Sequence, residues 1–278
     1  MAKYDAPAVL RLWHLASVDA PTVAVVWAMA FAWAEGVRLP AWLPVLIALV
    51  VWVIYVADRL LDARKALQSG RDDGLRERHR FHWRYRRILE PLAIAAAAAA
   101  AGIVVALVPA ASRGGDTVVG AAALAYFTRV HSGDRLEQTS ARFRLPILTK
   151  EFLVGVLFAA GCALPSWNRA GLRAWPFAAP VGYFAALAWL NCHAIDRWES
   201  HAGGNSIARA AALLAAAGGA VAAFVLAEEP RMAALLLAGA TAAMLLAWLD
   251  CVRGRLTPIA LRAAADLALL TPLALLLR

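Results

Sequence analysis

Charged residues and cysteines are scarce in this chain of 278 residues. Charged residues make up 17% and hydrophobic residues 62%, and the mean hydropathy is +0.63. Soluble domains carry about 25% charged residues, so this composition argues against a soluble enzyme, a disordered protein and a nucleic-acid-binding domain. The three cysteines lie in apolar runs without CxxC spacing, which predicts neither a disulfide framework nor a zinc site. A cleavable signal peptide is not expected from the short, mixed N-terminal segment.

Long apolar segments are abundant. A helix that spans a bilayer needs about 20 mostly apolar residues, and nine segments come close to that length. The sequence therefore predicts an all-α membrane protein: a bundle of nine transmembrane helices forming one domain over residues 1–278. The predicted spans are 17–35, 41–61, 89–109, 116–131, 148–166, 175–196, 207–227, 231–250 and 258–277.

The net charge of +9 follows from where the basic residues lie. With a cytoplasmic N-terminus, the cytoplasmic segments carry 21 Lys and Arg residues and the opposite side carries 6. This asymmetry is typical of the positive-inside rule and accounts for the charge without a nucleic acid partner. We expect an integral protein of a bacterial inner membrane, with the C-terminus on the opposite side. The largest basic block, the predicted cytoplasmic loop 63–88, lies either on anionic lipid or over a polyanionic substrate.

Two pairs of acids close two of the predicted helices. Asp58 and Asp62 are spaced i, i+4, and Asp196 and Glu199 are spaced i, i+3, so each pair shares a helix face. Asn191 precedes the second pair by a little over one turn. Both helices would run toward the cytoplasm, so both pairs would meet at one membrane edge. The acids either pair with neighbouring arginines or, because like charges repel, are joined by a cation. Oxygen ligands favour Mg²⁺ together with substrate phosphates.

The order of the helices and the placement of these acids resemble the UbiA superfamily of intramembrane prenyltransferases. In that family an Asn/Asp-xxx-Asp-xxx-Asp motif closes the second helix. The sequence AspArgLeuLeuAsp at 58–62 matches its last two acids, and Ile54 stands at the leading position. The sixth helix of the family commonly ends with Asp-xxx-Asp. Asp196 matches the first acid there, and Ser200 replaces the second.

The resemblance implies Mg²⁺-dependent ionisation of a prenyl diphosphate in a cavity open to the cytoplasmic edge and laterally to lipid. It implies that Arg129, Lys150 and Arg64 bind the diphosphate, and that Trp52, Tyr55 and Tyr126 line the cavity and stabilise cationic charge. The acids expected to act in catalysis and to bind Mg²⁺, with Asn191 as a further ligand, are Asp58, Asp62, Asp196 and Glu199.

Several functions are compatible with this pattern. The first is transfer of the prenyl group to a lipophilic acceptor. The second is a terpene cyclase of the same superfamily, which would need no acceptor. The third, from another class, is an ion-coupled transporter that uses Asp58, Asp196 and Asp266 as an ion path. A scaffold without chemistry is the fourth.

Other acids in the predicted spans need partners, because a charge in the bilayer centre is costly. Asp266 has Arg262 at i−4, so the sequence predicts a local ion pair between them. Asp19 and Glu151 are each either paired or on a cavity wall. The six histidines show no spacing typical of metal ligands.

Overall fold

The structure is a computed structural model that describes residues 3–68, 76–109, 120, 150–170, 174–200 and 204–277. Within these ranges the regular elements are helices, apart from an isolated β-bridge between Tyr4 and Leu256. The helices are α1 (Ala8–Leu15), α2 (Asp19–Glu35), α3 (Trp42–Gln68), α4 (Glu77–Arg84), α5 (Arg86–Leu107), α7 (Lys150–Ala170), α8 (Ala174–Glu199), α9 (Ser206–Val225), α10 (Pro230–Val252), a 3₁₀ turn (Arg253–Arg255), α11 (Pro258–Ala268) and α12 (Leu273–Leu276).

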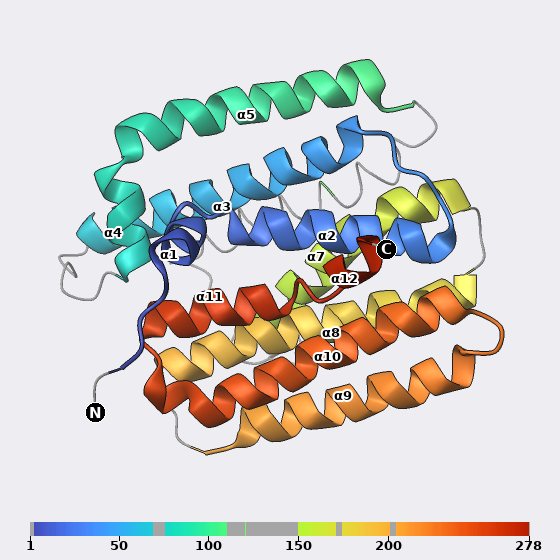
Figure 1. Cartoon of the computed structure of the whole chain (residues 1–278). Helices are drawn as coiled ribbons and strands as arrows, with labels where there is room; N and C mark the ends of the chain where they lie inside the picture. Colours follow the sequence, from blue (N-terminus) through green and yellow to red (C-terminus); the bar gives the residue numbers. More distant parts are fainter. Residues whose placement is uncertain are drawn as a thin grey trace, which may run out of the picture.

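The long helices run side by side, as Figure 1 shows. In that view α1 and α4 lie at the left end of the bundle, where α3 and α8 end and α11 begins. We call this end of the bundle the α4 end. Among the described elements, α9 packs on α10, α7 on α8, and α3 on both α2 and α5.

Among the described residues, five helices are long and apolar enough to cross a membrane: α3, α5, α7, α9 and α10. There are six such spans if α1 and α2, which are bent by 86° relative to each other, are counted as one broken span. The described part of the chain is therefore helical and compatible with an integral membrane protein, as the sequence predicts.

Four predicted segments differ from the structure or lie outside its described residues. The predicted span 258–277 is interrupted between α11 and α12, because Pro272 has no backbone N–H to continue the helix. The predicted loop 63–88 holds the last six residues of α3, the whole of α4 and the first three residues of α5. The predicted span 116–131 lies outside the described residues except for Gly120. The predicted span 175–196 lies within α8, which is not one of the five helices above.

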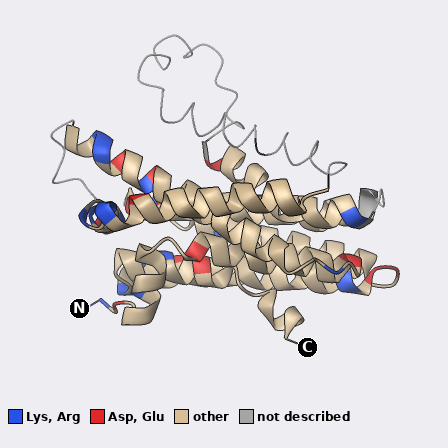
Figure 2. Ribbon diagram, turned by 90° about the horizontal axis from the view of Figure 1, so that it is seen from above, with Lys and Arg blue, Asp and Glu red and all other residues tan. Residues whose placement is uncertain are grey.

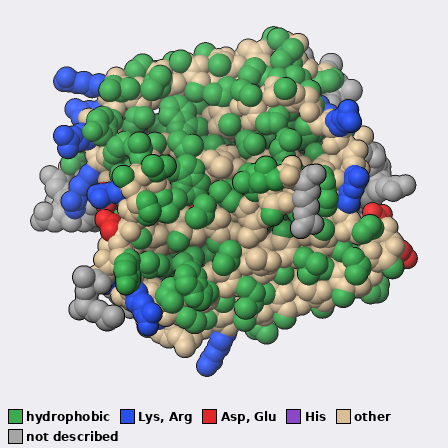
Figure 3. All heavy atoms as spheres, in the orientation of Figure 1, with side chains coloured by type: hydrophobic (Ala, Val, Ile, Leu, Met, Phe, Trp, Pro, Cys, Tyr) green, Lys and Arg blue, Asp and Glu red, His purple; other side chains and the backbone are tan. Residues whose placement is uncertain are grey.

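The surface of the bundle is apolar between its two ends. Figure 3 shows hydrophobic side chains over most of the visible face, with Lys and Arg at its edges. Figure 2 shows the same separation along the helices. Phe224, Leu213 and Ile94 are 85%, 72% and 71% exposed. Large apolar patches of this kind are rare on soluble monomers and suit contact with lipid.

Aromatic residues join the helices of the core. The rings of Trp27 and Phe184 stack with centroids 3.8 Å apart and link α2 to α8. Trp27 Nε1 donates a hydrogen bond of 2.8 Å to the carbonyl of Leu269, just after the end of α11. A helix end leaves carbonyls without intrahelical partners, so this bond stabilises the break between α11 and α12.

The turn between α1 and α2 is built around Ser17. Its φ of 55° lies in the left-handed region, which is unusual for a residue other than glycine. Ser17 is fully buried, and its Oγ lies 3.2 Å from His82 Nε2 of α4 and accepts a hydrogen bond of 3.4 Å from Arg59 Nε of α3. The side-chain bonds fix the sharp bend that brings His14, near the end of α1, to Asp19 at the start of α2.

Candidate functional site

A cavity of about 590 Å³ lies among α2, α3, α7, α8 and α11, with residues of α1 and α4 at the α4 end. Its apolar wall is formed mainly by one face of α3, where the lining positions recur every three or four residues, and by one face of α7. The principal apolar lining residues are Leu43, Leu46, Ile47, Val50, Val51, Ile54, Val154, Leu157, Phe158, Gly161 and Pro165.

Charged residues line the same cavity, mostly toward the α4 end. Of the described residues, five arginines and six acids contribute, so the two signs nearly balance. The cavity therefore combines a long apolar wall with a highly charged end. The charged lining residues are Asp19, Asp58, Arg59, Arg76, Arg78, Glu151, Arg169, Asp196, Glu199, Arg262 and Asp266.

Residues from both acid motifs reach this cavity. Asp58 of α3 and Asp196 of α8 both line it, although 138 positions separate them in the chain. Glu199, Asn191 and Tyr55 line it too. Because α3 and α8 line the same cavity, five residues that the sequence assigns to one site lie around it.

Three other predicted site residues lie away from the cavity lining. The side chain of Asp62 is 41% exposed, and its Oδ2 lies 4.0 Å from His79 Nε2 on α4. Trp52 Nε1 donates a hydrogen bond of 3.1 Å to the carbonyl of Ala16, which fixes the indole against the turn after α1. Arg64 is exposed. Asp62 is thus one turn from Asp58 but is directed toward α4.

Further predicted residues cannot be compared with the geometry. Arg129 and Tyr126 lie outside the described residues, and the side chain of Lys150 does too, although α7 begins at this residue. The next residue, Glu151, lines the cavity, which agrees with one of the two roles that the sequence allows for it.

Glu199 is held by two arginines. Its carboxylate forms an ion pair with Arg262 of α11, and Arg76 Nη2, just before α4, lies 2.7 Å from Glu199 Oε2. The prediction that Arg262 pairs with Asp266 is wrong. Arg262 reaches across to α8, where it contacts Glu199, while Asp266 takes partners from α1 and α8. The spacing i−4 puts Arg262 and Asp266 on one face of α11. It does not show that the Glu199 carboxylate of α8 lies closer to Arg262.

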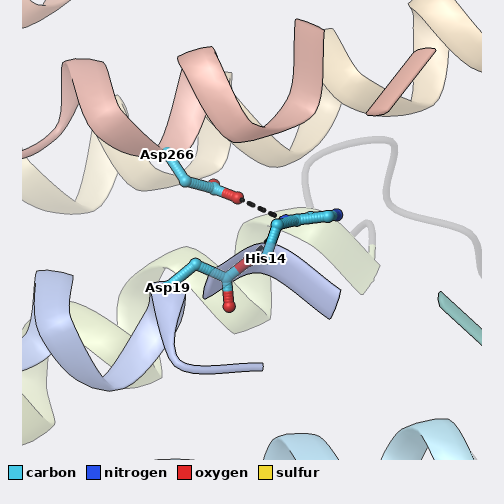
Figure 4. Close-up of side chains that lie close together, drawn as sticks. All are labelled: His14, Asp19 and Asp266. Carbon is cyan, nitrogen blue, oxygen red and sulfur yellow. Dashed lines mark hydrogen bonds and ion pairs between the residues drawn. The ribbon is translucent and has the colours of Figure 1, made fainter. Parts of the chain in front are cut away.

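Asp266 belongs to a cluster with His14 and Asp19, shown in Figure 4. His14 Nδ1 lies 2.6 Å from Asp19 Oδ2 and 3.5 Å from Asp266 Oδ2. Asn191 Nδ2 donates a hydrogen bond of 3.0 Å to Asp266 Oδ1. The residues come from α1, α2, α8 and α11. Sequence reasoning missed this cluster because no local spacing joins the residues; the signals were two acids within predicted spans, Asp19 and Asp266.

Two buried arginine nitrogens at the α4 end have no hydrogen-bond partner within the described residues: Arg78 Nε and Arg262 Nε. Burial, and then the positive charges of Arg59 and Arg76, lower the pKa of Arg78 well below its ordinary value. An anion in the cavity would accept hydrogen bonds from these nitrogens and offset the repulsion among the cations.

This arrangement can accommodate an amphiphilic anion. The charged end offers arginine donors and carboxylates for a polar head group, and the faces of α3 and α7 offer an apolar surface for a hydrocarbon chain. Carboxylates at the same end provide ligands for a divalent cation. Compared with protein-family models, with curated proteins and with solved structures, the chain matches none.

Proposed function

We propose that this chain is a prenyl-diphosphate-dependent enzyme of the membrane, which transfers the prenyl group to a lipophilic acceptor. One observation carries the proposal: Asp58 of α3 and Asp196 of α8, the two acids that match the motifs of the UbiA superfamily, line the same cavity as a long apolar stripe. Acids that served only as ion-pair partners would need no more than neighbouring arginines. A diphosphate with a hydrocarbon tail needs acids, cations and apolar surface in one place.

The apolar stripe suits the prenyl chain. On α3 it runs from Leu43 to Ile54, about 16 Å along the helix axis. It ends at Tyr55 and Asp58, so a chain lying along it would place its diphosphate at the α4 end. The apolar walls would keep water from an allylic cation, and the ring of Tyr55, 5.7 Å from the Arg59 guanidinium carbon, would face developing positive charge.

The arginines suit the leaving diphosphate. Arg78 and Arg262 carry buried Nε donors without acceptors in the described part of the chain, and Arg59 and Arg76 line the same end. These side chains would bind and orient the diphosphate and stabilise the charge that grows on it as the C–O bond breaks. Glu199 would position Arg76 and Arg262, because both contact its carboxylate.

The acids suit a magnesium ion. Asp58 and Asp196 both line the cavity and would be its ligands, whereas Asn191, the further ligand that the sequence suggests, donates from Nδ2 to Asp266. Carboxylate and amide oxygens are the donors that Mg²⁺ prefers. When bound, Mg²⁺ would neutralise the diphosphate and make it a better leaving group. Glu199 is already held by two arginines, and Asp62 lies outside the cavity lining, so the proposal depends on Asp58 and Asp196.

The membrane arrangement is part of the proposal. We infer nine spans in a bacterial inner membrane, with the N-terminus in the cytoplasm and the C-terminus opposite. The α4 end would then be the cytoplasmic end. The charged residues there would contact the head group of the substrate, and lipid would lie beside the apolar stripe. The 21-to-6 asymmetry of Lys and Arg supports this orientation.

The test uses the purified full chain in detergent with Mg²⁺ and geranyl, farnesyl or geranylgeranyl diphosphate. We expect release of inorganic diphosphate that requires a quinoid, aromatic or lipid acceptor and yields a prenylated product. Cyclic terpenes formed without an acceptor would show that the chain is a terpene cyclase and not a transferase. Absence of diphosphate release with every substrate and acceptor would contradict both.

A further inference from the structure

The cluster of His14, Asp19, Asp266 and Asn191 forms a polar group of its own on the cavity wall. We propose that it binds a divalent transition-metal ion, of the kind of Mn²⁺, Fe²⁺ or Zn²⁺, through one imidazole nitrogen, two carboxylates and one amide oxygen. This site goes beyond the proposed prenyl transfer and uses neither Asp58 nor Asp196.

The distances suit such an ion. One ligand atom from each of His14, Asp19 and Asp266 lies within 4.8 Å of the other two. Ligand atoms held about 2.0–2.2 Å from a metal lie roughly 3–4 Å from each other, so side-chain shifts of up to about an ångström would place the three ligand atoms around one ion. The three side chains come from α1, α2 and α11, and Figure 4 shows them converging.

Asn191 provides an independent observation. Only 5% of this residue is exposed, and its Oδ1 is buried without a hydrogen-bond partner in the described part of the chain. Its Nδ2 donates to Asp266, which ties the amide to the cluster. Buried acceptors are almost always satisfied, so this amide oxygen, next to the Asp266 carboxylate, is available to a further ligand, which we assign to the cation.

The charges favour a cation as well. His14 and Asp19 are each 3% exposed, and two carboxylates converge on a single imidazole. On binding, the metal would form bonds to His14 Nδ1 and to the carboxylate oxygens, and the proton between His14 and Asp19 would leave to solvent through the cavity. The imidazole distinguishes this site from an all-oxygen one: it favours transition metals over Mg²⁺.

The test uses the full chain in detergent, freed of metal by a chelator, titrated with Mn²⁺ alone and with no diphosphate present. We expect one bound Mn²⁺ per chain by electron paramagnetic resonance, nitrogen modulation in the electron spin echo from one imidazole, and no displacement by excess Mg²⁺. His14→Gln, whose amide can still donate to Asp19, should remove the nitrogen modulation and weaken binding at least tenfold. The control His79→Gln, on α4, should change neither.

Three results would overturn the site: no Mn²⁺ binding, Mn²⁺ held by oxygen alone, or unchanged binding in the His14→Gln variant. If that variant does not fold, the spin-echo measurement on the unaltered chain still decides between nitrogen and oxygen coordination. Failure of the metal site leaves the prenyl transfer proposal intact, since diphosphate release is measured separately with Mg²⁺.

Discussion

The carboxylate of Glu199 on α8 forms an ion pair with the guanidinium of Arg262 on α11. The side chains are 17% and 7% exposed, so the pair lies mostly away from solvent. It explains why the second acid motif offers Asp196, and not Glu199, as the metal ligand in the proposed site. It also attaches α11 to the end of α8 at the point where Arg76 arrives from the segment before α4.

Removing one partner of this pair should destabilise the protein. Arg262→Met leaves the Glu199 carboxylate largely buried beside Arg76 alone, and we expect a loss of about 2–4 kcal/mol in the free energy of unfolding. Thermal unfolding in detergent measures it. Arg76→Met should have a smaller effect, because the Arg76 side chain is 47% exposed. Equal destabilisation by the two variants would contradict the central place given to Arg262.

The ring of Tyr183 fits between two glycines, Gly218 of α9 and Gly239 of α10. A Cβ atom at either position would lie 2.6 Å from a ring carbon of Tyr183. Gly218→Ala and Gly239→Ala should each destabilise the protein by about 1–3 kcal/mol through overpacking. Gly219→Ala is the matched control, since its Cβ would meet nothing within 4 Å. A Gly219 variant as unstable as the other two would show that backbone freedom, and not contact with Tyr183, decides the effect.

Acidification should loosen the attachment of α4. Burial lowers the pKa of His82 to about 4, and burial followed by the charge of Arg78 lowers that of His79 to about 3. His82 Nδ1 donates to the carbonyl of Arg78 at 2.8 Å, which leaves Nε2 to accept from Ser17.

Both folded-state pKa values lie below the ordinary 6.5, so protonation favours the unfolded state. Above pH 6.5 the neutral rings make their full contribution to the free energy of unfolding. Below pH 6.5 this contribution falls by at most about 1.4 kcal/mol per histidine for each pH unit, until the pH reaches the pKa of the folded state. Thermal unfolding between pH 7.5 and 4.5 should show this loss, and the double variant His79→Gln/His82→Gln should show a shallower slope. An unchanged slope would contradict it.

Gly161 offers a way to shorten the apolar wall. It lines the cavity on α7, and a Cβ there would meet nothing within 4 Å. Gly161→Leu should therefore fold and occupy the cavity. If prenyl chains lie along this wall, turnover of geranylgeranyl diphosphate should fall at least tenfold more than turnover of geranyl diphosphate. An equal loss of turnover for both substrates would show that the prenyl chain does not lie along this wall.

Much of the helical architecture could be predicted from the sequence, because apolar length and proline position are local properties. Eight of the nine predicted spans fall in the described residues, and each contains helix. The break after α11 could not be located from apolar length, since the residues on both sides of Pro272 are equally apolar.

The site was only partly predictable. The acids Asp58 and Asp196 could be assigned to one site because each ends an apolar helix and both helices have the same predicted direction. The ion-pair partners of charged residues could not be predicted, because they depend on how neighbouring helices are rotated about their axes. Arg262 was assigned to Asp266 on its own helix, whereas it contacts Glu199, and His14 meets Asp19 only because the turn at Ser17 bends the chain.

We propose that Asp58 and Asp196 act together on a diphosphate in one cavity. The most direct test is Mg²⁺-dependent diphosphate release by Asp58→Asn and Asp196→Asn variants, with Glu90→Gln, an exposed acid on α5, as the control. We expect each aspartate variant to lose at least 100-fold in kcat while its thermal unfolding stays within a few degrees of the unaltered protein, and the control to keep full activity. Full turnover in either aspartate variant would show that Asp58 and Asp196 do not act together on the diphosphate.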